Sequence, residues 1–372
     1  MRRLIWLTVI LLFWPGMAWA AEAAPDYGDL EQAIEEVGDY LGDYLPRDSL
    51  RQIWQDVKNG DLALDLGLFK RLAAAVFGQE LAGVLRLFGQ LMVLTVCGML
   101  LAGFGGGGVA KLAAAVINLA AAALAVLAFT TAGGVAGEAI GIMTDFLYAL
   151  LPVLLTLLAS VGGGGTVALF NPALLVTVSA ALHILRGFVM PLLYVSGALS
   201  AGGRLSGGLK LGGLAKLSRD LAMGVFTVML TVFTGLLGVL GLSSAALSGL
   251  GYRAVKSAGS AFIPVVGRAL ADTLDSVIGT ALLLKNIIGL AGIIILLLIC
   301  ILPGIKILML YAAFRVAGAL AEPLGSAELS ALLNDMAGVV VLFFAVAAMA
   351  GLFFFFLISI TIGMGNLMLA LR

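Results

Sequence analysis

One stretch of this sequence places three charged side chains where they could act together. In FIPVVGRALADTLDSV, residues 262–277, Arg268, Asp272 and Asp275 recur at helical spacing and form one narrow stripe. A stripe of this kind can form an internal ion pair, line a water path or contact a partner protein.

Side chains that commonly carry catalysis are sparse elsewhere. His183 is the only histidine, and its isolation near the end of an apolar segment is typical of a packing residue. No Cys, His and carboxylate cluster has the spacing of a metal site, and the glycine runs lack the Lys-Ser/Thr of a phosphate-binding loop. We therefore predict that the protein is not an enzyme, has no cofactor and no energy source of its own, and does not bind nucleic acid.

The composition identifies the surroundings of the charged stripe. Hydrophobic residues make up 62% of the chain and charged residues 11%, and the mean hydropathy is +1.14. Soluble domains carry about 25% charged residues. The sequence therefore predicts an all-α integral membrane protein that contacts membrane lipid.

The amino-terminal part divides into two segments before this membrane body. Residues 1–20 have two arginines, a short apolar run and a small-x-small site, which indicates a signal peptide cleaved after Ala20. Residues 21–80 hold thirteen acids against five bases and are expected to form helices outside the cytoplasm. Their apolar stripes, such as Leu30, Ile34 and Val37, could pack on each other, on a partner or on the membrane surface.

Residues 81–372 are expected to form a polytopic helical bundle. A span needs about 20 apolar residues. Counting Phe146–Leu185 as two spans, we expect about eight spans, within a range of seven to ten. The charge-free stretches are 87–110, 112–137, 146–185, 187–203, 221–252, 286–305 and 336–371.

Prolines within or beside these stretches are candidate helix breaks, which mark binding sites in transporters. The alternative role, starting a helix at its first turn, is the commoner one. The candidate breaks are Pro152, Asn171, Pro172, Pro191 and Pro264.

Two arguments give the same orientation. If residue 80 lies outside, counting spans places the loop 204–219 in the cytoplasm. That loop carries Arg204, Lys210, Lys216 and Arg219, as the tendency of basic loops to stay inside requires.

Three short matches, in constant order, indicate an internal duplication, although apolar residues of this kind also match by chance. They pair residues 107–112 with 212–217, 151–159 with 263–271, and 195–200 with 316–321.

The energetic cost of charge restricts where the stripe can lie. A charge at a helix centre in lipid costs about 2.5–3.5 kcal/mol, so three lipid-facing charges would be hard to tolerate. Either the helix lies along the membrane interface, or it spans with the stripe turned toward water or a partner. Both interpretations remain open at this point.

Several motifs resemble the stage III sporulation protein AE family. They are SAFIPVVGRALADTLDSVIGTALLLKN (260–286), LYALLPVLLTLLASVGGG (147–164) followed by FNPALL (170–175), and the tail GMGNLMLALR (363–372). The signal peptide, acidic segment and multi-span body agree with this resemblance, which covers most of the chain beyond about residue 40.

The resemblance implies a protein of the mother-cell membrane around the forespore, within a channel or secretion-like apparatus needed after engulfment. It implies partners from the same operon, including an ATPase, and a channel partner from the forespore. An autonomous small-solute permease is the alternative. The candidate contacts to a pore or a partner are Arg268, Asp272, Asp275, Lys285 and Asn286.

Overall fold

The computed structural model describes residues 28–43, 66–103, 108–159, 176–205, 211–235 and 266–370, and these residues fold into helices without a strand. The prediction of an all-α membrane protein is confirmed. The long helices are α4 (Leu66–Gly103), α5 (Gly108–Leu158), a helix from Val176 that continues as α7 (Met190–Leu205), a helix Gly212–Gly235, α9 (Val266–Ala321) and α10 (Ala327–Ala370).

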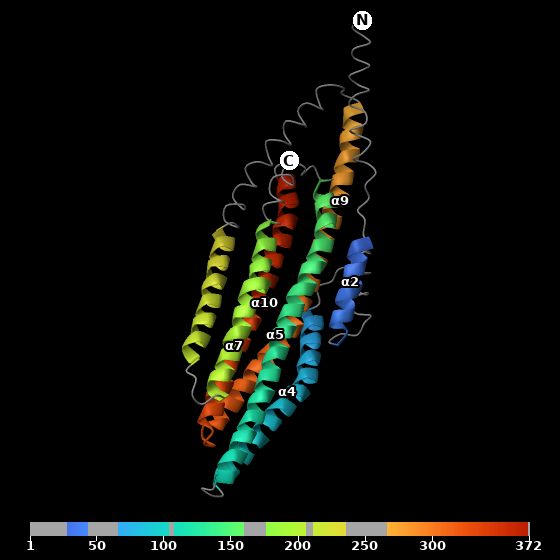
Figure 1. The fold of residues 1–372 in the computed structure, drawn as a ribbon. Coiled ribbons are helices and arrows are strands. Elements are labelled where there is room, and N and C mark those ends of the chain that lie inside the picture. Colours follow the sequence, from blue (N-terminus) through green and yellow to red (C-terminus); the bar gives the residue numbers. More distant parts are fainter. Residues whose placement is uncertain are drawn as a thin grey trace.

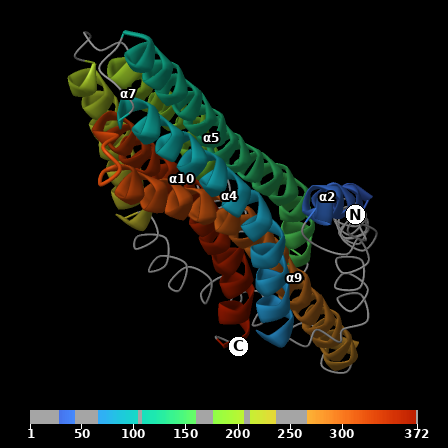
Figure 2. The ribbon, with the colours of Figure 1, turned by 90° about the horizontal axis from the view of Figure 1, so that it is seen from below.

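The helices α9 and α10 form an antiparallel hairpin at the centre of the bundle (Figure 1). Gly325, at φ 81°, closes the turn between them in a conformation that favours glycine. We call the end of the bundle that holds this turn the hairpin end. Helix α5 packs on both members of the hairpin, α4 covers α5 and α9, and α7 contacts α10 and α5, as the view in Figure 2 also shows.

The three longest of these helices are each much longer than a membrane is thick. They contain 51 residues in α5, 56 in α9 and 44 in α10. At a rise of 1.5 Å per residue, α9 is about 84 Å long and α5 about 77 Å, whereas the hydrocarbon core measures about 30 Å. Tilting does not absorb so large a difference, so parts of these helices extend beyond a single bilayer.

The described residues contain six helices long and apolar enough to cross a membrane, and the expected count of eight is not confirmed. Two interruptions that we expected are absent. Glu138 and Asp145 separate the expected stretches 112–137 and 146–185 but lie inside the continuous helix α5, and Arg186, which separates 146–185 from 187–203, lies inside the candidate span Val176–Arg204. Six spans are two fewer than the eight expected, so the number of spans remains even. The ends of the helices after Arg186 therefore stay on the sides of the membrane that we expected.

The candidate helix breaks at two prolines are not seen as breaks. Helix α5 runs through Pro152 and ends at Leu158. Before Pro191 the chain forms a π-helical turn, η3 (Leu185–Val189), in which the Met190 N–H donates to the Leu185 carbonyl. A π-turn shifts the hydrogen-bond register, so the helix continues although proline lacks an N–H. Asn171, Pro172 and Pro264 lie outside the described residues.

The amino-terminal acidic helix packs on the bundle. Helix α2 (Gly28–Tyr40) buries Leu30, Ile34 and Val37, and it contacts α5. We expected this apolar stripe to pack on a second stripe, on a partner or on the membrane surface. It packs on the bundle of its own chain instead. The signal peptide and residues 44–65 of the acidic segment lie outside the described residues, and the expected boundary at residue 80 falls within α4.

Aromatic side chains pack together in the interior where α5, α7 and α10 meet. Phe129, Tyr194 and Phe343 pack against one another with ring centroids 5.0–6.0 Å apart. Glycines make room for them: a Cβ atom at Gly133 would collide with the ring of Tyr194, and one at Gly197 would collide with Phe129. The single chain therefore has a packed core at this level.

The helix directions agree with two of the three short matches and not with the third, because residues 151–158 lie in α5, which runs away from the hairpin end, whereas 266–271 lie in α9, which runs toward it. Helix α5, which begins at Gly108, and the helix that begins at Gly212 both start at the hairpin end (Figure 1). The segments 195–200 and 316–321 both lie in helices that run toward that end. The duplication itself stays a prediction.

The orientation can be checked with single cysteines. In a chain whose own Cys97 and Cys300 are replaced by alanine, we expect Glu36→Cys, exposed on α2, to react from outside with a membrane-impermeant maleimide. We expect Glu328→Cys, exposed at the hairpin end, to react only after lysis, because basic loops favour the cytoplasm. Expression in vegetative cells keeps the outer face accessible to the reagent, and the reverse labelling would overturn the topology.

Candidate functional site

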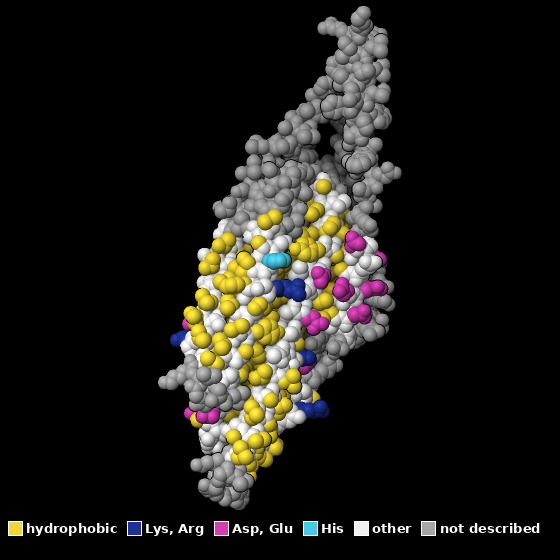
Figure 3. All heavy atoms as spheres, viewed as in Figure 1, with side chains coloured by type: hydrophobic (Ala, Val, Ile, Leu, Met, Phe, Trp, Pro, Cys, Tyr) yellow, Lys and Arg dark blue, Asp and Glu magenta, His cyan; other side chains and the backbone are white. Residues whose placement is uncertain are grey.

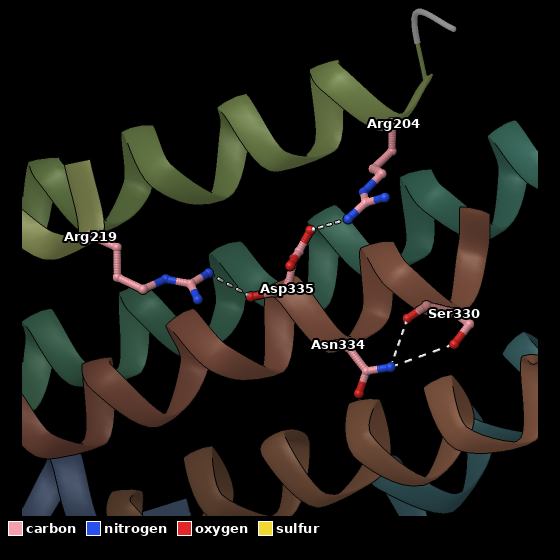
Figure 4. Close-up of polar contacts among 5 residues, drawn as sticks. All are labelled: Arg204, Arg219, Ser330, Asn334 and Asp335. Carbon is pink, nitrogen blue, oxygen red and sulfur yellow. Dashed lines mark hydrogen bonds and ion pairs between the residues drawn. The ribbon is translucent and has the colours of Figure 1, made fainter. Parts of the chain in front are cut away.

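A polar network joins the helix ends at the hairpin end of the bundle. The Arg204 Nη2 atom, from the last turn of α7, donates to the Asp335 carboxylate on α10 at 3.1 Å. The Arg219 Nη2 atom, from the helix Gly212–Gly235, donates to the Asp335 backbone carbonyl at 3.2 Å. Figure 4 shows both guanidinium groups reaching Asp335, which therefore ties two helices to α10.

The preceding residue of α10, Asn334, makes the corresponding contact to α9. The Arg315 Nη1 atom donates to the Asn334 side-chain oxygen at 2.8 Å, and the Asn334 amide nitrogen donates to the Ser330 carbonyl at 3.0 Å. Adjacent residues of a helix point about 100° apart, so Asn334 and Asp335 serve neighbours on different sides of α10. One turn of α10 thus fixes the ends of three other helices.

Room for the Arg219 side chain comes from a glycine. A Cβ atom at Gly338 would lie 3.1 Å from Arg219 Nη1, closer than most real contacts of that kind. A second contact holds the same helix to α7, because the buried Ser196 hydroxyl donates to the Ala215 carbonyl at 2.9 Å. The helix Gly212–Gly235 is otherwise mostly exposed, and its other end is held by Phe233, which packs against Phe353 and Phe356 of α10.

An ion pair lies farther from the hairpin end, between α4 and α9. The Lys306 Nζ atom is 2.9 Å from Glu80 Oε1, and the two side chains are 28% and 18% exposed. The helical rise from Arg315 to Lys306 is about 14 Å. Lys306 therefore lies well inside the candidate span Leu283–Ala321, whereas Glu80 lies four residues from the start of the candidate span Val76–Leu101.

A second charged layer lies farther along the bundle. Glu138 and Asp145 are exposed on α5, and the guanidinium of Arg186 lies beside the intervening Gly141, where a Cβ atom would be 3.6 Å from its Nη2. Figure 3 shows acidic side chains gathered on the flank that α2 covers. The exposed acids of α2 are Asp29, Glu31, Glu35, Glu36 and Asp39.

The helix segments between the two charged layers form a mainly apolar belt, and the apolar runs 287–300 of α9 and 351–362 of α10 continue past the second layer. Gly351 of α10 is level with Met143, which lies between Glu138 and Asp145 on α5, because a Cβ atom at Gly351 would be 3.7 Å from the Met143 sulfur. The rise along α10 from Asp335 to Gly351 is about 24 Å, close to the 30 Å hydrocarbon core. The Glu80–Lys306 ion pair lies near the middle of this belt.

The structure places two of the candidate contact residues inside the bundle. Lys285 is fully buried, and its Nζ atom donates to the Ile362 carbonyl of α10 at 2.7 Å. The side-chain oxygen of Asn286 is also buried and has no hydrogen-bond partner among the described residues. Lys285 is therefore an internal contact between α9 and α10 in this chain rather than a surface contact.

The charged stripe within residues 262–277 lies on the amino-terminal part of α9. The backbone from Val266 onward is helical and continuous with the span Leu283–Ala321. The side chains of Arg268, Asp272 and Asp275 lie outside the described residues. Because α9 extends beyond the other helices at the end opposite the hairpin (Figure 1), this part of the helix continues past the second charged layer.

The Glu80–Lys306 pair and the network around Asp335 were not found from the sequence. Glu80 was assigned to the outer segment, and Lys306 follows directly after a charge-free stretch. An isolated charge next to a span is a signal that a partner exists, but it does not identify that partner. No group of three His, Cys, Asp or Glu side chains that could hold a metal lies within the described ranges.

Comparisons with known proteins agree with the resemblance seen in the sequence. A profile of the family described as stage III sporulation protein AE matches residues 49–365. The stage III sporulation protein AE of Bacillus subtilis (strain 168) is 32% identical over the whole of both chains. No solved structure matches this chain.

Proposed function

The chain belongs to the stage III sporulation protein AE family, and we propose that it is a membrane component of the channel or secretion-like apparatus between mother cell and forespore. In this role it is needed for endospore development after engulfment. It resides in the mother-cell-derived membrane around the forespore. Its partners are the other proteins of its operon, among them an ATPase, and a channel protein made in the forespore.

The observation that carries this proposal is the length of α9. Only about 20 residues are needed to cross a bilayer, and α9 has 56. Its amino-terminal third, with Arg268, Asp272 and Asp275, continues past the second charged layer as a helix. A projecting charged helix suits contact with a protein in the space between two membranes better than contact with lipid.

The packed interior argues against the permease alternative. Phe129, Tyr194 and Phe343 fill the space where α5, α7 and α10 meet, and the buried side chain of Lys285 bridges α9 and α10. A transport path through one copy would have to cross this core. A path formed between copies, or with partner proteins, would leave it intact.

Co-purification from sporulating cells tests the proposal. We expect the tagged chain to retain its operon partners, and the double variant Asp272→Ala/Asp275→Ala to lose them while it still accumulates in the membrane. The loss should be about tenfold or more, as expected when a charged contact worth at least 1.4 kcal/mol is removed. Spore yield should fall in parallel.

A matched variant controls for the removal of two carboxylates. Asp220→Ala/Glu322→Ala removes two exposed acids at the hairpin end and should leave co-purification unchanged. Normal spore yield and normal partner recovery in the Asp272/Asp275 variant would remove the charged stripe from the proposal. Solute transport by the purified chain alone in vesicles would favour the permease instead.

A further inference from the structure

Two membrane helices have faces that the rest of the described chain leaves uncovered. Of the six candidate spans, Val76–Leu101 in α4 and Gly212–Gly235 are the least buried. Helix α4 packs on α5 and α9, whereas the helix Gly212–Gly235 is held to α7 and α10 by the contacts described above. In Figure 1 the helix Gly212–Gly235 lies at the left edge of the bundle and α4 lies to the right of α5. The two uncovered faces therefore lie on different flanks of the bundle.

The uncovered faces carry exposed charges of opposite sign. Arg86 is exposed on α4, and Asp220 is exposed on the helix Gly212–Gly235. Neither side chain forms a hydrogen bond or an ion pair with another residue that the structure describes. A charge that faces hydrocarbon costs free energy, and the cost is largest at the helix centre. A contact that joins Arg86 to an acid and Asp220 to a base would lower both costs.

The two charges lie at nearly the same depth in the bundle. Helix α4 runs toward the hairpin end, and Arg86 follows the Glu80–Lys306 pair by about 9 Å in that direction. That pair lies about 14 Å from the polar network at the hairpin end, so Arg86 is about 5 Å from the level of the network. Asp220 belongs to the same level, because the preceding residue, Arg219, bonds to α10 within the network. Copies of the chain in one membrane share their orientation, so Arg86 of one copy can meet Asp220 of the next.

Neighbouring residues on each face extend this complementarity. The exposed residues at four-residue spacing are Gly78, Ala82, Arg86 and Gln90 on α4, here called the Arg86 stripe, and Lys216, Asp220 and Gly224 on the other helix, here called the Asp220 stripe. The two helices run in opposite directions, so the stripes meet antiparallel. With the two charges paired, Gln90 lies opposite Lys216 and can accept a hydrogen bond from it. Ala82 lies opposite Gly224, and small residues let helices in lipid approach closely.

We propose that copies of this chain associate side by side in the membrane, with the Arg86 stripe of one copy against the Asp220 stripe of the next. Because the stripes lie on different flanks, the contact is heterologous, and each copy binds two neighbours in a ring or a row. A Cβ atom at Gly78 or Gly224 would meet nothing within 4 Å, so the chain itself fills neither position. This contact is separate from the partner role proposed for Asp272 and Asp275, and either can fail without the other.

Two differently tagged copies, produced together in vegetative cells, test the contact by recovery of one tag with the other in a mild detergent. We expect the unsubstituted copies to co-purify. Arg86→Asp in both copies, or Asp220→Arg in both, should reduce recovery at least about tenfold, because like charges then face each other. One copy with Arg86→Asp and one with Asp220→Arg should restore recovery, because opposite charges face each other again. Asp145→Arg in both copies, an exposed acid on α5, is the matched control and should leave recovery unchanged.

A cross-link tests the contact without a change of charge. In chains whose Cys97 and Cys300 are replaced by alanine, Ala82→Cys in one copy and Gly224→Cys in the other should form a disulfide dimer that carries both tags. Ala82→Cys with Leu127→Cys, which is exposed on α5, should not. The proposal would be overturned by unsubstituted copies that do not co-purify, by undiminished recovery in both charge variants, or by no gain when variants that accumulate in the membrane are mixed. A missing cross-link between residues 82 and 224, or an equal one at residue 127, would overturn it as well.

Discussion

Replacing Glu80 by alanine is expected to reduce the amount of folded protein in the membrane severely. The change removes the carboxylate that lies 2.9 Å from Lys306, near the middle of the apolar belt. The side chains of Lys306 and Glu80 are 28% and 18% exposed, so both groups are largely removed from solvent. Removing one member of a fully buried ion pair costs about 3–5 kcal/mol, and this half-buried pair should cost less.

Thermal unfolding of the purified protein and its quantity in isolated membranes measure this effect. Arg86→Ala is the matched control, because it removes an exposed charge from the same helix and should have little effect. The double variant Glu80→Leu/Lys306→Met should recover most of the stability, since apolar pairs replace buried ion pairs at little or no cost. Unchanged stability in Glu80→Ala would show that the pair does not hold α4 to α9.

Leucine at Gly133 is expected to destabilise the bundle strongly, and leucine at the adjacent Gly134 is not. A Cβ atom at Gly133 already collides with the ring of Tyr194, whereas no atom lies within 4 Å of one at Gly134. Both positions are in α5, and leucine has nearly the helix propensity of alanine, so the two variants share the same backbone effect. Overpacking a core costs about 1–3 kcal/mol and occasionally more.

A second substitution distinguishes this collision from a general loss of helix packing. Tyr194→Ala removes the ring atoms that a side chain at Gly133 would meet, so it should recover part of the stability of Gly133→Leu. The recovery is measured as a coupling in a double-mutant cycle by thermal unfolding. Equal destabilisation by leucine at Gly133 and Gly134, or additive effects of Gly133→Leu and Tyr194→Ala, would contradict the close approach of α5 and α7.

Much of the architecture was predicted from local features of the sequence. The low charge content and the long apolar stretches identify a helical membrane protein, and the motifs identify its family. The apolar stripe of α2 was recognised by its helical spacing, and Leu30, Ile34 and Val37 are indeed buried. These features are predictable because hydrophobic periodicity and transfer free energy are properties of neighbouring residues.

The number of spans was harder to predict, because a charged residue in an apolar sequence can lie either in a loop between two spans or within one continuous helix. Glu138, Asp145 and Arg186 were interpreted as loop residues, but each lies within a continuous helix. The sequence does not reveal that these charges share a level near the edge of the belt, where charge costs little. That level depends on how α5 packs against its neighbours.

By itself, the sequence determined that this protein crosses a membrane, which residues are too costly to expose to lipid and to which family the chain belongs. Only the tertiary structure decided the partners of those residues. Arg204 meets Asp335 across 131 positions, and Glu80 meets Lys306 from another helix. The cost of burying a charge is a local property, whereas the group that offsets it is selected by the packing of helices that are far apart along the chain.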